Sequence, residues 1–534
     1  MREDKLLGRE SYLGIIEKRV SSLKDGYRQN IAIIGDELVG KTTLITGFLN
    51  KFCDTRIITA YLEIRPESTD SFIKRFIATL LYNLLINSGI GLKEDLDFLI
   101  NKSERYIPGT VKKIRAILQA NSKRSNKKMF FELMSLTESI KSETQKSCVI
   151  IFDEFHNLET LGFDNLYRDW SKIIIAQKDT MYIITSSMKF KTRAILSKNL
   201  SLLFGNFEVL NVEPFDIPSS EAYLEDRMQS LNISKSNKDF LVHFTGGYPF
   251  YLKVATEACL ESRGRPLADI IEGLLFDTSG VLNQRFSNYV KRFMDLNRSN
   301  EYMPILYLVA SGRNRIKEIA HIIKKPKKEV LQRISHLLEL DALMRNGDFL
   351  RVNDRVFGFW LRFVYQEKLN SLTYDAKNQK ASFRNKVEEM IEEFSMNSRK
   401  PVMERMVELL RLFEDETIQI DRKRVRLSHF REIKQLEFNS RTLKHGLIGR
   451  SSESLWLLAV KQGSLTENDV ADFSRECKKY RHKLQRKIII SFQDIETNTR
   501  LKAMEEKVWT WDINNLNSIM DLFSKPRLIP CESA

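Results

Sequence analysis

Residues 31–43 constrain the fold of this chain more than any other segment. A short apolar run at residues 31–34 (IAII) ends at Gly35, and the sequence continues GDELVGKTT into a helical stretch at 43–51. This fits the pattern GxxxxGK[ST] without a mismatch. Because the glycines let the backbone wrap an anion and successive N–H groups point inward, we predict a buried strand that enters a phosphate-binding loop.

Each residue type in this loop has an expected role. Lys41 would reach the β- and γ-phosphates of a nucleotide, and the Thr42 hydroxyl would ligate Mg²⁺. The positive end of the following helix would face the phosphates. The residues expected to cradle the phosphates are Gly35, Asp36, Glu37, Leu38, Val39, Gly40, Lys41, Thr42 and Thr43.

A second apolar run ends in two carboxylates about 110 residues later. Residues 148–154 read CVIIFDE, so a buried strand would deliver Asp153 and Glu154 to the carboxyl edge of the sheet. Asp153 would hold the Mg²⁺ shell through water, and Glu154 would orient and deprotonate the attacking water. The alternative is a strand that simply ends in two surface acids, and the spacing from the loop favours the site.

A third apolar run at 181–185 is followed by hydroxyl side chains. Thr185, Ser186 and Ser187 would either sense the γ-phosphate or cap the next helix, and the sequence leaves both alternatives open. Short apolar strands separated by helices predict a parallel α/β sheet.

The composition fits a large multidomain protein. The chain has 534 residues, which suggests three to four domains, and its 42% hydrophobic content can supply several cores. No apolar run approaches the ~18–20 residues needed to cross a bilayer, and the N-terminal residues are charged. The five cysteines are scattered singly. We therefore expect a cytoplasmic protein with reduced thiols and no membrane partner.

Four motifs together resemble a known family. Residues 7–10 (LGRE) precede a helix, and the phosphate loop, 151–155 (IFDEF) and 245–249 (TGGYP) follow in that order. Over about residues 1–370, and more weakly beyond, the chain resembles the archaeal-type ATPases, a branch of the AAA-like STAND P-loop NTPases. The resemblance implies Mg²⁺-dependent ATP hydrolysis. It implies that Arg9 lies near the nucleotide base, and that Pro249 belongs to a lid motif that closes over ATP and reports its state.

Two positions depart from the family pattern. His156 stands where family members often carry Gln, and Asn206 stands where they often carry Arg. If that arginine stabilises transition-state charge, another must replace it, and Arg168 and Arg193 are the nearest candidates. An arginine finger can contribute about 10³–10⁵ in rate, so slow turnover is expected without one.

Residues 303–352 have the pattern of a winged helix-turn-helix. Helical stretches at 303–311, 316–323 and 328–340 precede a hairpin that turns at Asn346-Gly347. Residues 313–333 hold eight basic and two acidic residues. The candidate DNA contacts at the start of the third helix and along it are Lys324, Lys325, Lys327, Lys328 and Arg333. The alternative is a winged helix that binds protein, with solvated lysines.

The family resemblance implies that the C-terminal region is a domain of restriction-endonuclease type. Such nucleases need one acid and then an acid-x-Lys on the next strand to hold Mg²⁺. Lys461 is retained, but His445 and Ala459 occupy the positions of the carboxylates. We therefore expect an inactive nuclease-like fold. A basic run at 475–487 would contact phosphates or be a solvated face, and both alternatives stay open.

These observations predict four domains. They are an α/β ATPase core at 1–218, a helical lid at 219–300, a winged helix at 301–370 and a nuclease-like α/β domain at 371–534. Residues 301–534 carry ten of the fifteen net positive charges, which favours DNA as a partner of the C-terminal modules. The leading hypothesis is an ATP-hydrolysing switch, with assembly into a homo-oligomer left open. The alternatives are a DNA-binding regulator with ATP as a structural ligand, and a nuclease effector.

Overall fold

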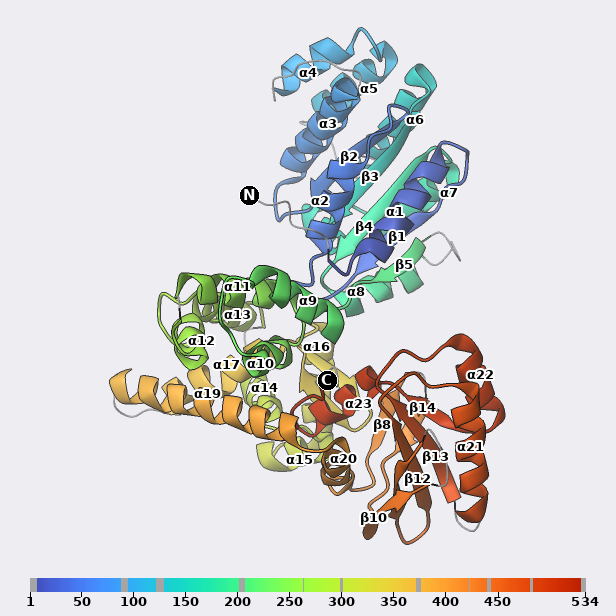
Figure 1. Cartoon of the computed structure of the whole chain (residues 1–534). Coiled ribbons are helices and arrows are strands. Elements are labelled where there is room, and N and C mark those ends of the chain that lie inside the picture. Colours follow the sequence, from blue (N-terminus) through green and yellow to red (C-terminus); the bar gives the residue numbers. More distant parts are fainter. Residues whose placement is uncertain are drawn as a thin grey trace. The chain divides into compact units, whose positions relative to one another are not determined.

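The computed structural model divides the chain into two compact units, and the four-way division predicted above is finer than this. The first unit comprises Met1–Tyr223 with two short later segments, Tyr248–Phe250 and Glu339–Asp341, and the second comprises the remainder. Most of the elements are labelled in Figure 1. The structure describes residues 7–87, 95–121, 129–200, 207–262, 264–297, 301–370, 376–421, 423–438, 443–480 and 484–529.

The first unit is built on a parallel five-stranded sheet with the order β2-β3-β4-β1-β5. The three predicted strands are confirmed as β1 (Asn30–Ile34), β3 (Ser147–Asp153) and β4 (Thr180–Ser186), and all their residues are buried. Because β4 lies between β1 and β3, the phosphate loop and the two acids follow the strands on either side of it.

Two strands were not predicted. β2 (Ile57–Glu63) alternates buried and half-buried residues, so it lacks the continuous apolar run of its neighbours. β5 (Phe207–Asn211) lies at the sheet edge, and of its five residues only Leu210 is buried. Edge strands need little apolar sequence, which explains why the pattern was weak.

Helices lie on both faces of this sheet (Figure 1). Trp170 is fully buried and its ring meets those of Phe130, Phe152, Phe155 and Tyr182, so the helices on one face share a single aromatic core with β3 and β4. The helices are α1 (Glu10–Leu23), α2 (Lys41–Lys51), α3 (Thr69–Ile86), α4 (Leu96–Ser103), α5 (Pro108–Asn121), α6 (Met129–Thr144), α7 (Leu166–Ala176) and α8 (Lys189–Ala194). The predicted interruption at 121–128 lies almost entirely outside the described residues.

The second unit begins with the helices predicted after residue 218. They are α9 (Ile217–Arg227), whose first turns group with the first unit, α10 (Lys235–Thr245), α11 (Pro249–Glu261), α12 (Leu267–Leu275) and α13 (Val281–Asn297). Next come the three predicted helices and hairpin, which are α14 (Tyr302–Ala310), α15 (Ile316–Ile323), α16 (Lys327–Glu339), β6 (Leu343–Asn346) and β7 (Phe349–Val352). The last helices before the C-terminal sheet are α17 (Arg355–Trp360), α18 (Gln366–Asn370), α19 (Ala376–Arg399) and α20 (Val402–Leu410).

The C-terminal region folds into a mixed α/β arrangement. A hairpin of β8 (Thr417–Ile420) and β9 (Lys423–Arg426) precedes a five-stranded sheet, which is antiparallel from β10 to β12 and parallel from β12 to β14. The sheet consists of β10 (Glu432–Glu437), β11 (His445–Arg450), β12 (Leu455–Lys461), β13 (Leu484–Ser491) and β14 (Trp509–Trp511). Helices α21 (Glu467–Cys477), α22 (Thr497–Glu505) and α23 (Ile513–Leu522) connect and follow its strands.

A buried carboxylate joins distant parts of the second unit. Asp521 in α23 contacts Arg355, Arg527 and Arg351 at 2.7, 2.7 and 3.0 Å, and its side chain is 3% exposed. Burial alone would raise the pKa of Asp521, but the three guanidinium groups hold it far below its ordinary value. Arg355 also lies 2.9 Å from Nε2 of His243 in α10, so the network reaches the first helices of this unit.

The described residues include no helix that is long and apolar enough to cross a membrane. The four cysteines within them, Cys53, Cys148, Cys259 and Cys477, are free thiols in the structure.

We predict that Asp521→Ala destabilises the second unit by about 3–5 kcal/mol, because it leaves three arginines without their buried partner. Urea unfolding followed by tryptophan fluorescence would report this, since Trp360, Trp456, Trp509 and Trp511 all belong to that unit. Asp494→Ala, at an exposed site, is the control. Equal unfolding midpoints for the two variants would contradict the proposed role of Asp521.

Candidate functional site

The loop after β1 has a backbone that few sequences allow. Gly40 has φ 91° and Leu38 has φ 70°, so two residues adopt the left-handed region. A Cβ on Gly35 would lie 2.4 Å from the carbonyl oxygen of Val212, so only glycine fits there. Val39 is fully buried beneath the loop. The sequence therefore fixes the loop in a wrapped conformation ahead of α2.

Lys41 points into this loop. Its ammonium donates to the carbonyl oxygens of Gly35 and Asp36 at 3.1 and 2.9 Å, and it lies 3.8 Å from Oε1 of Glu154. Burial lowers the pKa of Lys41, and the nearby charges of Glu154, Asp153 and Asp36 oppose that shift. A buried cation inside a wrapped loop is the arrangement that an anionic ligand requires.

Asp153 is the most heavily bonded side chain of the site. It is 1% exposed, and its Oδ2 accepts hydrogen bonds from Thr42 Oγ1 at 2.9 Å and from the Tyr61 hydroxyl at 2.7 Å. Its Oδ1 accepts a hydrogen bond from Thr185 Oγ1. Burial and the bond to Asp153 raise the pKa of Tyr61. The two predicted Mg²⁺ ligands, Thr42 and Asp153, are thus in direct contact.

Glu154 follows Asp153 with φ 53°, in the left-handed region. The N–H and the hydroxyl of Ser187 both donate to its Oε2 at 2.8 Å, and its own N–H donates to Thr185 Oγ1 at 3.1 Å. Glu154 is half-buried, with 26% of its side chain exposed. Its carboxylate is therefore held in one orientation beside Lys41.

His156 supports the same carboxylate. Its Nδ1 lies 2.8 Å from Ser186 Oγ and 3.3 Å from Oε2 of Glu154. Burial, together with the positive charges of Lys191 and Lys41, lowers the pKa of His156 to about 4. The imidazole is therefore neutral near pH 7 and acts on Glu154 as a dipole.

The hydroxyls that end β4 bind the acids. Thr185 bonds Asp153, Ser187 bonds Glu154, and helix α8 has no side-chain cap at its first turn. The sequence had left helix capping open, and it gave no signal for Tyr61. The semi-alternating pattern of β2, which places Tyr61 on the strand next to β3, was the only available clue.

Arg9 braces the loop from the N-terminal side. It is 5% exposed, and its guanidinium donates to the carbonyl oxygens of Val39 and Glu213 at 2.9 and 2.7 Å. It also lies 4.9 Å from the ring of Phe215, and burial lowers its pKa. Arg9 is thus adjacent to the loop, and its contact with a nucleotide base stays a prediction.

The glycine motif at 245–249 includes a residue that contacts the phosphate loop. Tyr248, which groups with that unit, donates from its hydroxyl to Oδ2 of Asp36 at 3.2 Å. Asp36 also pairs with Lys189 at 2.6 Å. Pro249 is the first residue of α11, and its role in nucleotide binding stays a prediction. Asn206 lies outside the described residues.

The basic residues at the start of α16 differ in their availability. Lys324, Lys327 and Lys328 are exposed. Lys325 instead pairs with Glu301 at 2.7 Å, and Arg333 pairs with Glu301 at 2.5 Å and with Glu329. Two of the five candidate DNA contacts are therefore engaged within the protein.

The predicted nuclease positions do not assemble a carboxylate site. Ala459 is buried opposite Gly446, and Lys461 pairs with Asp469, which is 1% exposed and caps α21, at 3.2 Å. Within the described ranges, no three His, Cys, Asp or Glu side chains are grouped to hold a metal ion. Three of the residues in the basic run at 475–487 lie outside those ranges.

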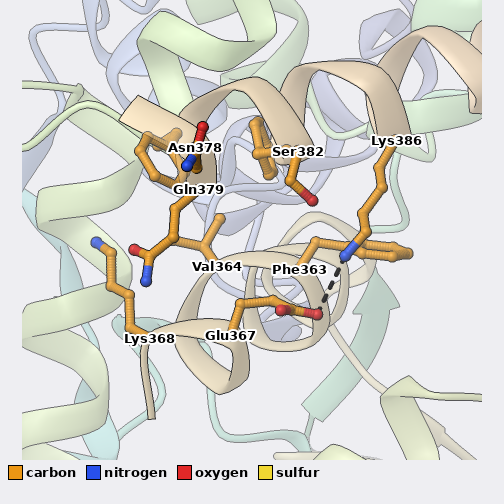
Figure 2. Close-up of a pocket in the computed structure, with 10 residues that line it drawn as sticks. Phe363, Val364, Glu367, Lys368, Asn378, Gln379, Ser382 and Lys386 are labelled. Atoms are coloured by element: carbon orange, nitrogen blue, oxygen red, sulfur yellow. Dashed lines mark hydrogen bonds and ion pairs between the residues drawn. The ribbon is translucent and has the colours of Figure 1, made fainter. Parts of the chain in front are cut away.

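A pocket of about 320 Å³ lies in the second unit (Figure 2). In its lining, Lys386 contacts Glu367 at 3.1 Å, and Lys368 lies 5.5 Å from the ring of Phe276. None of the residues of the phosphate loop line it, so this pocket is separate from the site described above.

The family comparison agrees with the geometry. Residues 7–254 match the model of a family described as an ATPase domain predominantly from Archaea. Residues 7–254 are therefore similar to an archaeal-type ATPase domain. No curated protein matches this sequence at a significant level.

Several solved structures are similar to part of this chain. The Walker-type ATPase PABY2304 of Pyrococcus abyssi is 18% identical over 67% of this chain and 97% of its own, with a TM-score of 0.51. The ORC2 protein of Aeropyrum pernix, in ADPNP–ADP complexes, is 12% identical over 69% and 96% of the two chains, with a TM-score of 0.41. The RuvB Holliday junction branch migration motor of Thermotoga maritima is 10% identical over 67% and 97%, with a TM-score of 0.32. The shared α/β fold rests on the first of these.

We predict that Gly35→Ala destabilises the ATPase domain by about 1–3 kcal/mol, because the new Cβ would overlap the carbonyl oxygen of Val212. Thermal unfolding followed by circular dichroism measures the effect. Gly14→Ala is the matched control, since Gly14 lies within α1 with no atom near its Cβ, and there alanine should stabilise. A parent-like melting temperature for Gly35→Ala would contradict the close approach.

The lowered pKa of His156 predicts a pH effect on stability. Between about pH 6.5 and 4 the unfolded chain binds a proton at His156 and the folded chain does not, so this residue makes stability fall as the pH falls. The loss approaches about 3 kcal/mol at pH 4. His156→Gln should abolish that component, and exposed His321→Gln should not. Urea midpoints at several pH values measure it, and identical pH slopes for the parent and His156→Gln would refute the assignment.

Proposed function

We propose that the ATPase domain binds Mg²⁺-ATP and hydrolyses it, and that its nucleotide state controls DNA- or protein-binding modules in the second unit. The observation that carries this proposal is the contact between Thr42 and Asp153, 2.9 Å long, beside the buried ammonium of Lys41. It joins the phosphate loop to the strand that bears the acids.

The residues present fit Mg²⁺-ATP. Thr42 and Asp153 offer a hydroxyl and a carboxylate, and Mg²⁺ prefers a few such oxygens while keeping several waters. Bound Mg²⁺ would neutralise charge on the phosphates. The loop N–H groups and Lys41 would bind the phosphate oxygens, and Lys41 would exchange its bonds to loop carbonyls for bonds to the ligand.

Glu154 is the proposed general base. Ser187 fixes Oε2 with two hydrogen bonds, and His156 adds a third neighbour, which leaves Oε1 to accept a proton from an attacking water. Ser187 and His156 are positioning residues in this scheme, because they act on Glu154 and not on the reacting atoms.

Turnover is expected to be slow without a further arginine. Arg168 on α7 is exposed, and Arg193 donates to Asn211 Oδ1 at 3.1 Å. Among the described residues, neither contacts Lys41, Asp153 or Glu154. An arginine supplied by a second copy or by another partner would raise the rate.

Tyr248 supports the proposed coupling to the second unit. Its hydroxyl binds Asp36 of the phosphate loop, and it follows directly after the two glycines that end α10. Gly246 and Gly247 both have positive φ, so this junction has a backbone that glycine favours. A nucleotide that reshapes the loop at Asp36 would change the Tyr248 contact at the same junction.

A role in DNA contact is the second proposal for the chain. Three exposed lysines, Lys324, Lys327 and Lys328, lie at the start of α16 in a winged-helix order of elements, and lysines there suit phosphate contacts. In this version ATP acts as a structural ligand of a DNA-binding regulator. We do not propose nuclease activity, since Lys461 is paired with Asp469 and Ala459 cannot hold a metal.

We predict that Lys41→Ala abolishes ATP binding, while Glu154→Gln retains binding and lowers turnover by about 100-fold to 10 000-fold. Fluorescent-nucleotide titration and phosphate release measure the two properties. Glu159→Gln, a partly exposed acid nearby in the sequence, is the control and should behave like the parent. Hydrolysis by Lys41→Ala at the rate of the parent would contradict the assignment of residues 35–43 as the ATP-binding loop.

The same variants separate a switch from a regulator with structural ATP. If ATP is only structural, DNA binding by Glu154→Gln will equal that of the parent under turnover conditions. A switch predicts different binding, since Glu154→Gln would remain in the ATP state. Mass measurement with a non-hydrolysable analogue then tests whether copies of the chain assemble around ATP.

A further inference from the structure

The turn of the β6–β7 hairpin is occupied by another part of the second unit. The Asp348 N–H donates to the Thr417 carbonyl at 2.9 Å, and the Thr417 N–H donates to Asp348 Oδ2 at 2.8 Å. The Gln419 N–H donates to Asn346 Oδ1 at 2.6 Å, and Asn346 Nδ2 donates to the Gln419 carbonyl at 3.0 Å. A wing that contacts DNA uses such a turn, but here four hydrogen bonds commit it to β8.

The approach at this turn is close. Gly347 has φ 61°, and a Cβ there would lie 1.9 Å from the carbonyl oxygen of Thr417. Phe349 further opposes separation of the turn from β8, because it is 1% exposed and belongs to the core of the C-terminal region. Arg315 adds an ion pair with Glu416 at 2.6 Å, where Glu416 is 8% exposed. Releasing the turn would therefore expose apolar surface and break a partly buried ion pair, both of which are unfavourable.

Strand β9, which pairs with β8, carries two arginine side chains on one face. In the β8–β9 hairpin, Arg424 pairs with Gln419 and Arg426 with Thr417. Side chains of directly paired residues lie on the same face of a hairpin. Both arginines therefore share a face with the side chains of Thr417 and Gln419, the two β8 residues that bind the β6–β7 turn. The opposite face carries Ile418 and Val425, which are fully buried in the core.

Both arginines are available to an external anion. Arg424 and Arg426 are exposed. Within the described residues, Arg426 has one ion pair, with Asp415 at 3.4 Å. Both side chains are about half or more exposed, and such surface pairs contribute little to stability. Arg424 has no ion-pair partner within the described part of the chain. Arginine binds phosphate with a planar, bidentate fork, so this pair favours a phosphate backbone as its partner.

The end of the same strand adds cations stacked on an aromatic ring. Lys423, which begins β9, is exposed and lies 5.4 Å from the ring of Trp509. The guanidinium of Arg486 lies 4.0 Å from that ring, and its buried Nε has no hydrogen-bond partner. The basic character of β9 therefore continues toward the edge strand β14 of the C-terminal sheet.

We propose that β9 takes the place of the wing, so that duplex DNA lies with its phosphates against Arg424 and Arg426 while α16 supplies the other contact. This rests on the DNA contact proposed above for Lys324, Lys327 and Lys328. In this proposal the turn at Asn346–Asp348 binds β8 and thereby holds the β8–β9 hairpin in place. The turn itself does not enter a groove of the DNA.

Fluorescence anisotropy of the full chain with a duplex DNA of about 21 base pairs, two helical turns, tests this. Affinity is measured between about 50 and 200 mM salt. We expect Arg424→Ala/Arg426→Ala to weaken binding and to lower the slope of log affinity against log salt by about 2, one for each lost phosphate contact. Arg424→Lys/Arg426→Lys should keep the slope of the parent.

Matched controls separate a local effect from net charge. Lys434→Ala/Arg450→Ala removes the same charge from exposed positions of the C-terminal sheet and should leave the slope unchanged. Circular dichroism melting checks that each variant folds. A parent-like slope for Arg424→Ala/Arg426→Ala, or an equal loss in the control, would overturn the role of β9.

A third variant distinguishes this proposal from the function on which it rests. If Lys324→Ala/Lys327→Ala/Lys328→Ala weakens DNA binding and the β9 variant does not, β9 is wrong and the α16 contact stands. If the parent chain does not bind DNA at about 50 mM salt, both DNA proposals fail, while the ATPase assignment is unaffected. Tighter binding of a duplex RNA of equal length would overturn DNA as the partner.

Discussion

The hydrogen bonds to Asp153 hold the first unit together at the carboxyl edge of its sheet. Three hydroxyls, from Thr42 on α2, Tyr61 on β2 and Thr185 on β4, bind this one buried carboxylate on β3. A buried carboxylate without such donors would be very costly. Since each donor comes from a different element, satisfying Asp153 also fixes the ends of three strands relative to the phosphate loop. The orientation of Glu154 follows from that arrangement.

Much of this site could be predicted from the sequence because its signals are local. The loop at 35–43 and the strand ending in Asp153 each lie within one short segment, and buried parallel strands are continuous apolar runs. The contacts of Tyr61 with Asp153 and of Ser187 with Glu154 could not be predicted in this way. These contacts depend on the strand order β2-β3-β4, which no single segment encodes. β5 was missed because an edge strand with one buried residue has little apolar pattern.

In the second unit, too, local elements could be predicted from the sequence and long-range contacts could not. The helices α14 to α16 and the hairpin at Asn346-Gly347 were predicted within a few residues. The bonds of that hairpin to β8 join residues about 70 positions apart, and they pair the side chains of Asn346 and Asp348 with backbone groups of β8 that any sequence provides. Asp521 is similar, because nothing in its helix indicates three arginines from β7, α17 and the C-terminal segment. Polar contacts between residues far apart in the chain could therefore not be predicted from local sequence patterns.

The burial of Phe349 bears on the order in which the chain can fold. This residue and the turn at Asn346–Asp348 are synthesised well before β8 and α23, which complete their surroundings. Until then the hairpin would expose an aromatic side chain and unpaired polar groups, features that make folding intermediates prone to aggregate. A fragment that stops near residue 370 would retain that exposure permanently. The smallest independently folding piece that includes α14 to β7 should therefore extend through the C-terminal sheet.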